Sequence, residues 1–267
     1  MLAQFRPATA PPEIQKSAAK EPREVKGKRL VMDALNAVGG DKFLEMQDRI
    51  ESGRAYSFYR EELRGLSFAK IYTRYLSIPP DPKQIGQRER QSFGKNEDNS
   101  VLFTETEGWE LTFRGARPLP DDQIERWRLS TLHNIFYILR QRLKEPGMVF
   151  EWQKTEVWSN QPIEVVDITD SENRTVTVSF HQSTKLPVRQ LFYRRDNLTR
   201  DRIDEVTIYS KYRDVGGGVQ WPFTILRERN GEKIYEIFSD SVTINKNLTD
   251  DKFLIPSNIK KLEKIEK

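Results

Sequence analysis

The sequence contains no cysteine and only two histidines, His133 and His181, among its 267 residues. Without thiols the chain forms no disulfide, no thiolate metal site and no cysteine nucleophile. The two histidines stand in unrelated contexts, and no serine lies in a Gly-x-Ser-x-Gly turn that would expose it beside an activating base. Adjacent carboxylates such as Asp121-Asp122 lack the spacing of a calcium loop. We therefore expect no catalytic residue, no metal ligand and no cofactor, and structural roles for both histidines.

The sequence also lacks a long apolar run and an excess of charge of either sign. No run approaches the roughly 20 apolar residues of a membrane-spanning helix. Forty-four basic residues stand against 40 acidic ones, which gives a net charge of +4, and the two signs are interspersed. A nucleic-acid partner is therefore disfavoured, because no strongly basic field forms.

The ends of the chain differ in composition from its middle. Met1-Leu2-Ala3-Gln4 before a Pro/Ala-rich stretch is typical of a mature N-terminus to which a start methionine has been added. We therefore expect a removed signal peptide and export to the periplasm, which the lack of cysteine also allows. Residues 1–24 are predicted to form a flexible arm, 25–258 one domain, and 259–267 a charged tail that frays.

Period-two alternation dominates the region from Gln161 to Ile244. Val176, Val178 and Phe180, for example, alternate with polar residues. Alternation of this kind predicts strands with one apolar face and one solvated face. Turn-forming residues separate the runs, and Asn230-Gly231 is a strong hairpin signal because both residues tolerate positive φ. This region is predicted to form an antiparallel meander.

Two helices with apolar faces are predicted, over Lys26–Val38 and from Pro118 to about Lys144. The strands expected around the second helix are Arg49–Glu61, Ser67–Ile78, Lys83–Gly94, Ser100–Glu107, Gly108–Arg114 and Met148–Ser159. Blocks of strands separated by a helix indicate an α+β fold. The most economical arrangement is a single curved antiparallel sheet of about 10–11 strands, with both helices packed on its concave face.

Several segments resemble a known bacterial family. They are Ala34-Leu35-Asn36-Ala37-Val38-Gly39-Gly40, Leu186-Pro187-Val188-Arg189, the stretch from Tyr209 to Gly217, Val219-Gln220-Trp221-Pro222-Phe223, and Leu248-Thr249-Asp250-Asp251-Lys252-Phe253. Together they resemble the outer-membrane lipoprotein-carrier (LolA/LolB-like) superfamily over about residues 28–256. The resemblance implies a half-open antiparallel β-barrel with helices as a lid, and a cavity for acyl chains. Its motifs are structural, and a fold alone does not determine a function.

An apolar cleft between sheet and helices is the site that this resemblance implies. The bulky apolar residues that are candidates to line it are Trp109, Phe136, Leu139, Trp152, Trp158, Phe180, Trp221 and Phe223. Each of them also fits a role in ordinary core packing, since ligand pockets resemble cores in composition. Arg194-Arg195 and Arg227/Arg229 fit the solvated face of strands, with contact to anionic lipid headgroups as an alternative.

The function expected from these observations is that of a non-enzymatic periplasmic binding or carrier protein, monomeric, for a lipid, a lipoprotein acyl chain or another amphiphile. The membrane surface or envelope proteins are further expected partners. Two alternatives stay open. One is an envelope protein-protein interaction or scaffold module whose core is filled by side chains. The other is an enzyme of a type that no motif in the sequence indicates.

Overall fold

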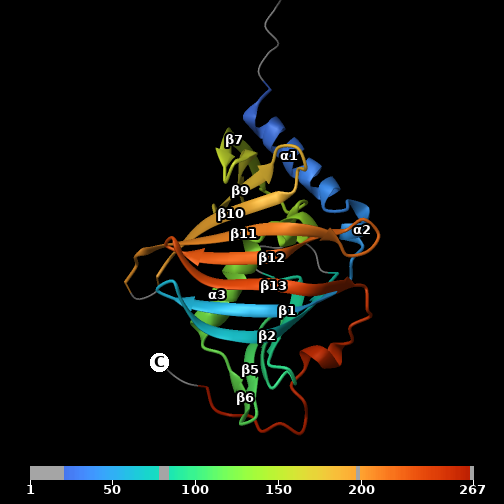
Figure 1. Ribbon diagram of the computed structural model, residues 1–267, viewed down its shortest axis with the longest axis vertical. Coiled ribbons are helices and arrows are strands. Elements are labelled where there is room, and N and C mark those ends of the chain that lie inside the picture. Colours follow the sequence, from blue (N-terminus) through green and yellow to red (C-terminus); the bar gives the residue numbers. More distant parts are fainter. Residues whose placement is uncertain (1–20, 78–83, 197–198, 265–267) are drawn as a thin grey trace, which may run out of the picture.

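A single antiparallel sheet forms the framework of the protein (Figure 1). The computed structural model describes residues 21–77, 84–196 and 199–264. Thirteen strands lie in the order β6-β5-β4-β3-β2-β1-β13-β12-β11-β10-β9-β8-β7. They are β1 (Asp48–Tyr59), β2 (Glu62–Tyr75), β3 (Gln87–Phe93), β4 (Asn99–Phe103), β5 (Gly108–Thr112), β6 (Gly115–Pro118), β7 (Val149–Trp158), β8 (Gln161–Thr169), β9 (Thr175–His181), β10 (Pro187–Arg195), β11 (Arg202–Asp214), β12 (Gln220–Arg229) and β13 (Glu232–Ile244). The predicted α+β fold built on one curved antiparallel sheet is confirmed.

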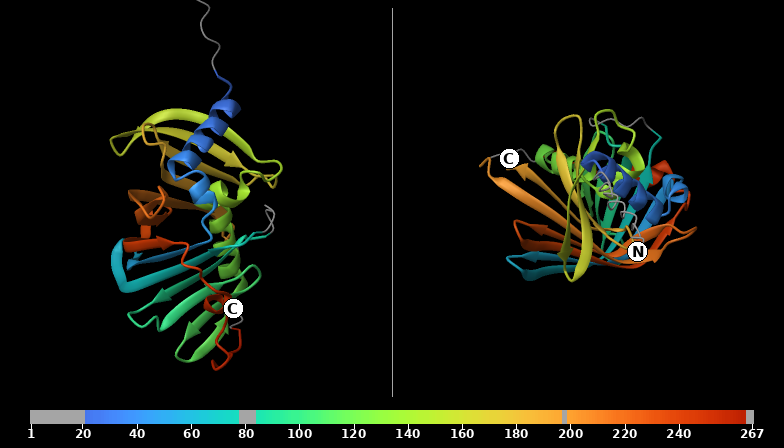
Figure 2. Two further views of the ribbon diagram at one scale, coloured as in Figure 1. Left: turned by 90° about the vertical axis from the view of Figure 1, so that its right-hand side faces the viewer. Right: turned by 90° about the horizontal axis from the view of Figure 1, so that it is seen from above.

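The sheet consists of two meanders that meet at its centre. Within β1–β6, and again within β7–β13, each strand pairs with the next one along the chain. β1 then pairs with β13, so that Ile50 lies opposite Thr243 and Ala55 lies opposite Ile237. The outer strands β6 and β7 do not pair with each other, so the curved sheet is a half-open barrel (Figure 2).

The sheet has more strands than the 10–11 predicted from the sequence. β6 escaped prediction because it spans four residues, including Gly115 and Pro118, which are too few to show a period of two. The meander predicted between Gln161 and Ile244 is confirmed, and it comprises β8 to β13. Asn230 and Gly231 adopt φ values of 51° and 82° and join β12 to β13, as their hairpin signal predicts.

The helical segments lie on the concave side of the sheet or beside it. They are α1 (Arg23–Ala37), α2 (Asp41–Leu44), α3 (Asp121–Leu132), α4 (Ile135–Tyr137), the π-helical turn η1 (Ile138–Arg142) and the 3-10 turn η2 (Asp250–Phe253). α1 begins three residues before the predicted start and packs against β7 and β8. The approach to β7 is close at Gly27, where an added Cβ would lie 2.5 Å from the carbonyl oxygen of Phe150. Glycine therefore sets the distance between this helix and the sheet.

The segment between β6 and β7 crosses the concave face, because it connects opposite edges of the sheet (Figure 2). The prediction of one helix to about Lys144 is wrong: α3 ends at Leu132, and Asn134 is extended, with φ −72° and ψ 124°. The side-chain oxygen of Asn134 accepts hydrogen bonds from the N–H groups of Phe136 and Tyr137. Side-chain capping thus replaces the backbone bonds of a continuous helix, and the chain bends before α4.

The largest apolar core lies between the concave face and the helices α1, α2, α4 and η1. At the opposite end of the molecule, the C-terminal segment runs beside the edge strand β6. The N–H of Ala116 donates to the carbonyl of Lys260 at 2.8 Å, and Leu262 donates back to Ala116 at 2.8 Å. This pairing lies within the predicted tail 259–267. Most of the predicted arm, residues 1–20, lies outside the described residues. Within the described part, no helix is both long and apolar enough to span a membrane.

Candidate functional site

A cavity of about 600 Å³ lies between the concave face of the sheet and α3. Strands β1–β4 and β10–β13 form its floor, and α3, Asn134 and α4 form the opposite wall. The wall of the cavity touches the sheet at separate points. The ring of Trp127 on α3 stacks on that of Phe103 on β4, with centroids 4.6 Å apart and planes 1° apart. The neighbouring segment contacts the sheet through Phe136, whose ring lies 4.6 Å from that of Trp221 on β12.

The cavity lining is partly apolar and partly polar. Its large apolar side chains are Ile71, Phe93, Val101, Phe103, Trp127, Phe136, Phe192, Val206, Trp221, Ile225, Ile234 and Ile237. Its charged side chains are Arg49, Glu51, Glu89, Arg126, Arg194, Glu205, Arg227 and Arg229. Mixed lining of this kind suits a ligand that has both an apolar body and a polar group.

One end of the cavity is closed and contains Arg49 and Glu51, both deeply buried. The Arg49 guanidinium lies 3.8 Å from the centre of the Trp221 ring and donates to Thr73 Oγ1 at 3.0 Å. Its Nε is 3.9 Å from a carboxylate oxygen of Glu51, which is beyond hydrogen-bond distance. Ser239 donates a hydrogen bond to Glu51. Among the described residues, Arg49 Nε and Trp221 Nε1 are buried without an acceptor, so this end keeps two unused donors.

The other end of the cavity carries three arginines around one carboxylate. Glu205 Oε1 accepts from Arg194 Nε at 3.1 Å and from Arg229 Nε at 3.2 Å. Arg227 lies two residues before Arg229 on β12, opposite Thr207, and its guanidinium is 5.7 Å from the centre of the Tyr235 ring. Arg227 is exposed and Arg229 is 38% exposed in its side chain. This end is therefore open to solvent and has an excess of positive charge.

The bent segment that forms the cavity wall is held by polar contacts from β10 and from residues just before β1 and β3. Gln190 on β10 accepts a hydrogen bond from the N–H of Ile135 at 2.9 Å. Tyr137 accepts from the N–H of Gly86 at 2.6 Å, and burial raises the pKa of this phenol to about 12. Arg140 donates from two nitrogens to the carbonyl of Met46, at 3.1 and 2.7 Å. The wall is thus fixed at both sides by hydrogen bonds as well as by apolar packing.

Arg142, at the end of η1, fixes the same segment to the turn between β8 and β9. It donates to both carboxylate oxygens of Glu145, at 2.6 and 2.8 Å, and to Asp170 at 2.8 Å. A fourth bond, of 2.6 Å, reaches the carbonyl of Leu132 at the end of α3. Burial raises the pKa of Asp170, but hydrogen bonds from Arg142 and Arg174 outweigh that effect and leave the pKa below its usual value. Arg142, Glu145 and Asp170 are buried, so the loss of one of them would leave an opposite charge without its partner.

Comparisons by sequence find no relative: no protein-family model matches the chain, and no curated protein is significantly similar to it. Solved structures do match. A DUF1329 family protein from Desulfovibrio piger has a TM-score of 0.59 and 14% identity, over 90% of this chain and 100% of that one. An outer membrane lipoprotein-sorting protein domain from Vibrio parahaemolyticus has a TM-score of 0.57 and 11% identity, over 85% and 96%. A LolA superfamily protein from Nitrosomonas europaea has 0.50 and 13%, over 85% and 97%.

The chain has the LolA-like fold. At identities of 11% to 14% the likeness concerns the fold and not a ligand. The resemblance noted in the sequence motifs is thereby confirmed, including the half-open sheet with helices on its concave side.

Two of the eight residues predicted to line a cleft, Phe136 and Trp221, lie in the cavity of this LolA-like fold. Leu139, Phe180 and Phe223 are buried in the same apolar core but do not line the cavity. These three fill the space between the helices and the sheet. Five of the eight residues thus lie in the apolar layer between sheet and helices, and two of these five line the cavity.

The remaining three tryptophans lie away from the cavity. Trp152 packs at the edge of the core under Lys26, whose Nζ is 3.7 Å from the ring centre, and donates to Glu164 at 2.6 Å. Trp158 packs with a small cluster that includes Val188, on the opposite face of the sheet. Trp109 packs in a separate cluster near the C-terminal segment. Their size suggested a ligand site, but each has neighbours that account for its burial.

The sequence analysis missed the polar lining of the cavity. On β3, Gln87, Glu89 and Gln91 point to the cavity together with Phe93, so the concave face of this strand is mostly polar. A search for apolar alternation finds no signal there. Gln87, Glu89 and Gln91 do recur at every second position, and they pair with Tyr75, Thr73 and Ile71 of β2. Only the register shows that they share one face.

The two histidines have structural surroundings, as expected. His133 stacks on Phe192 with centroids 4.3 Å apart, and its Nδ1–H donates to the carbonyl of Leu129 at 2.6 Å. Burial lowers the pKa of His133 to about 4. His181 accepts from the N–H groups of Ser183 and Thr184 in the turn after β9. Among the described residues, no group of three or more acidic or imidazole side chains is placed to hold a metal ion.

Proposed function

We propose that this protein binds a lipid, a lipoprotein acyl chain or another amphiphile in the cavity between the sheet and α3, without catalysing a reaction. The observation that supports the proposal is the cavity itself. Its volume of about 600 Å³ lies within the range of small-molecule sites, and large apolar side chains of both sheet and helix line it. Each methylene group that enters contributes about 0.8 kcal/mol, so a chain binds there without a conserved polar motif.

The proposed binding function takes place in the cell envelope. The outer membrane lipoprotein-sorting protein domain from Vibrio parahaemolyticus has this fold. A carrier for such cargo works as a monomer in the periplasm and releases its cargo at a membrane surface. Movement of the bent wall segment away from the floor would widen the cavity for a bulky chain.

Direct binding measurements test this function. The protein is purified without detergent, and native mass spectrometry shows whether lipid is bound. An uncharged fluorescent probe, N-phenyl-1-naphthylamine, is then titrated and displaced with monoolein. We expect saturable binding of one probe per chain and complete displacement.

Two variants of β2 show whether binding occurs in the cavity. Ile71 faces the cavity and Leu66, on the same strand, is 59% exposed on the opposite face. Ile71→Trp fills space in the cavity and is expected to weaken monoolein binding about tenfold. Leu66→Trp adds the same side chain outside the cavity and is expected to leave binding unchanged. Absence of saturable binding, or equal effects of the two variants, would rule the function out.

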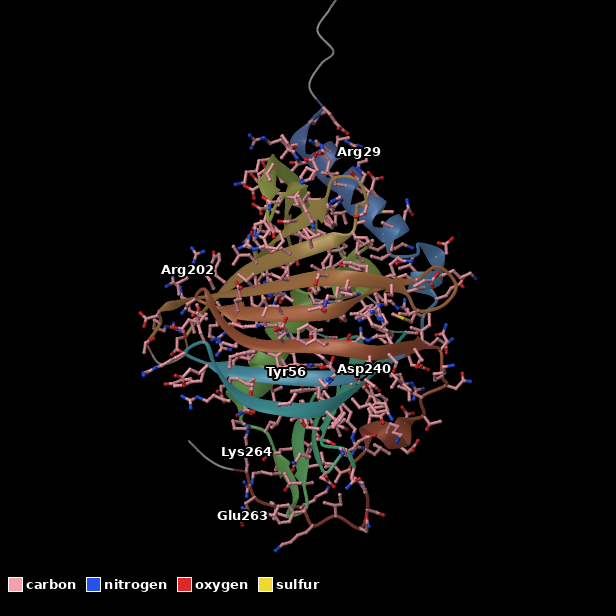
Figure 3. The ribbon with its side chains drawn as sticks, viewed as in Figure 1. Arg29, Tyr56, Arg202, Asp240, Glu263 and Lys264 are labelled. Carbon is pink, nitrogen blue, oxygen red and sulfur yellow. The ribbon has the colours of Figure 1, made fainter. Side chains whose placement is uncertain are left out.

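A second candidate function is an interaction module of the envelope, and one surface feature favours it. Tyr59, Leu63, Leu66 and Phe68 are 49% to 59% exposed on the β1–β2 hairpin. Tyr56, labelled in Figure 3, lies on the same hairpin. Exposed apolar patches of this kind often mark protein contacts. Leu66→Lys/Phe68→Lys should abolish such an association, measured by light scattering and cross-linking, while leaving monoolein binding intact.

A further inference from the structure

The open end of the cavity has an unbalanced positive charge that amphiphile binding as such does not require. Arg194, Arg227 and Arg229 surround one carboxylate, Glu205. Arg194 and Arg229 approach the same oxygen of Glu205 through Nε. Among the described residues, the terminal NH₂ groups of these two arginines make no hydrogen bond to this carboxylate, and they are groups with which arginine binds planar anions in a bidentate manner.

No second carboxylate balances this cluster within the described part of the chain. Arg227 has no acidic partner there within 4.0 Å, and its guanidinium lies over the ring of Tyr235. Partial burial strengthens the remaining charge, since the side chains of Arg194 and Glu205 are 14% and 17% exposed. The cluster thus combines an excess of positive charge with donors that are free and reachable from solvent.

The closed end of the cavity has the opposite balance of charge, with more acidic than basic side chains. There Glu51 and Glu89 line the cavity together with a single arginine, Arg49. Arg227 pairs with Tyr235, which pairs with Ser57 of β1, whereas Glu51 lies six residues earlier on β1. Six residues of strand correspond to about 20 Å. The two groups of charged residues are therefore separated along the strands, and positive charge is in excess only at the open end. Arg202, labelled in Figure 3, marks the beginning of β11 at this open end.

From this polarity we infer that the ligand is an amphiphile with an anionic headgroup, a carboxylate or a phosphate, bound by Arg194, Arg227 and Arg229 with its chain directed inward. This inference rests on the proposed function and adds the class and orientation of the ligand. The chain passes along Phe192 and Ile225, which line the cavity between the two ends. A neutral amphiphile makes the same apolar contacts with the cavity, but its headgroup makes no ionic contact with the three arginines.

The test compares two amphiphiles that share one acyl chain, oleate and monoolein, at pH 8 and below their aggregation concentrations. Each displaces N-phenyl-1-naphthylamine from the wild-type protein, and the ratio of the two dissociation constants is measured. We expect oleate to bind about fivefold more tightly, as two or three half-exposed charges allow. The ratio should shrink as salt is added, because the headgroup contact is electrostatic.

Three variants show whether the arginines around Glu205 cause the preference for oleate over monoolein. Arg227→Gln/Arg229→Gln should bring the ratio close to one, because the anionic headgroup loses its two exposed cationic partners. Glu205→Gln should raise the ratio, because it frees Arg194 and Arg229. The control Arg23→Gln/Arg54→Gln removes two exposed arginines outside the cavity, each 3.7 Å from an acid, and should leave the ratio unchanged.

The possible outcomes separate this inference from the proposed function. Saturable binding of both amphiphiles with a ratio near one overturns the inference alone. A ratio that Arg227→Gln/Arg229→Gln and the control variant change equally also overturns it. Failure of both amphiphiles to displace the probe overturns the proposed function itself.

Discussion

At the scale of single residues, His133 links the stability of the protein to pH. Its imidazole is buried against Phe192, and burial lowers its pKa to about 4, against 6.5 in an unfolded chain. Between these values the unfolded chain binds a proton that the folded chain does not. The free energy of unfolding therefore falls as pH decreases from about 6.5 to 4, by up to about 3 kcal/mol from this group.

Denaturant unfolding of two variants between pH 4.5 and 7.5 checks this expectation. His133→Phe keeps an aromatic ring beside Phe192 but cannot take up a proton, so its stability should depend less on pH than that of the wild type. His181→Asn keeps an acceptor for the turn N–H groups and should retain the wild-type dependence. Equal pH slopes for His133→Phe and the wild type would contradict the assignment.

Arg142 is the residue whose loss should most weaken the bent segment. Its guanidinium joins Glu145, Asp170 and the end of α3, and its side chain is 4% exposed. Arg142→Met leaves Glu145 buried without its partner and leaves Asp170 with Arg174 as its remaining cation, which costs about 3–5 kcal/mol. Chemical denaturation should show this loss. Arg29→Met, at an exposed ion pair with Glu21, should cost less than about 1 kcal/mol, and a similar small cost for Arg142→Met would show that the network is dispensable.

At the scale of elements, the position of α1 depends on Gly27. Alanine is the better helix former by about 1 kcal/mol, so Gly27→Ala would stabilise an isolated helix. In the protein the new Cβ would lie 2.5 Å from Phe150 O and 2.8 Å from Trp152 N, both backbone atoms that yield little. We expect a net loss of stability and a shift of α1 away from β7.

Thermal unfolding and the fluorescence of Trp152, which lies at this contact, measure the effect. Lys28→Ala at the exposed neighbouring position is the matched control and should change stability by less than about 0.5 kcal/mol. A Gly27→Ala variant that is more stable than the wild type would show that the helix and the strand separate without penalty.

At the scale of the whole molecule, ligand binding should stabilise the fold as one unit. The cavity is lined by strands of both meanders and by α3, so a ligand touches parts that come from distant regions of the sequence. At a free concentration of 100 times its Kd, a ligand adds about 2.7 kcal/mol to the free energy of unfolding. For a chain of this size that corresponds to roughly 5–10 °C in Tm.

Differential scanning calorimetry with oleate, at concentrations below its aggregation threshold, tests this stabilisation. The wild type and Leu66→Trp should show the same shift, and Ile71→Trp should show little. A shift of equal size in all three proteins would indicate that oleate acts on the surface and not in the cavity.

Local patterns in the sequence were enough to predict most of the strands and the class of fold. Alternation with a period of two and turn residues such as Asn230-Gly231 act between near neighbours, so they survive in a single sequence. The same holds for α1, whose apolar residues recur on one face. The motifs between Leu186 and Phe253 carried the resemblance to the LolA-like fold for the same reason, because they encode strands and turns.

Only the tertiary structure decided where the helix breaks, which strands meet and what lines the cavity. Asn134 bends the chain because Gln190, 56 residues away, is present to accept from the next N–H. β1 meets β13 through pairing across most of the chain, and this brings Arg49 beneath Trp221. Long-range pairing of this kind leaves no periodic trace in the sequence. For that reason the size of Phe136 and Trp221 made them candidates in the sequence, whereas Glu89, Gln91 and the cluster around Glu205 came together in one cavity only when the sheet placed them on its concave face.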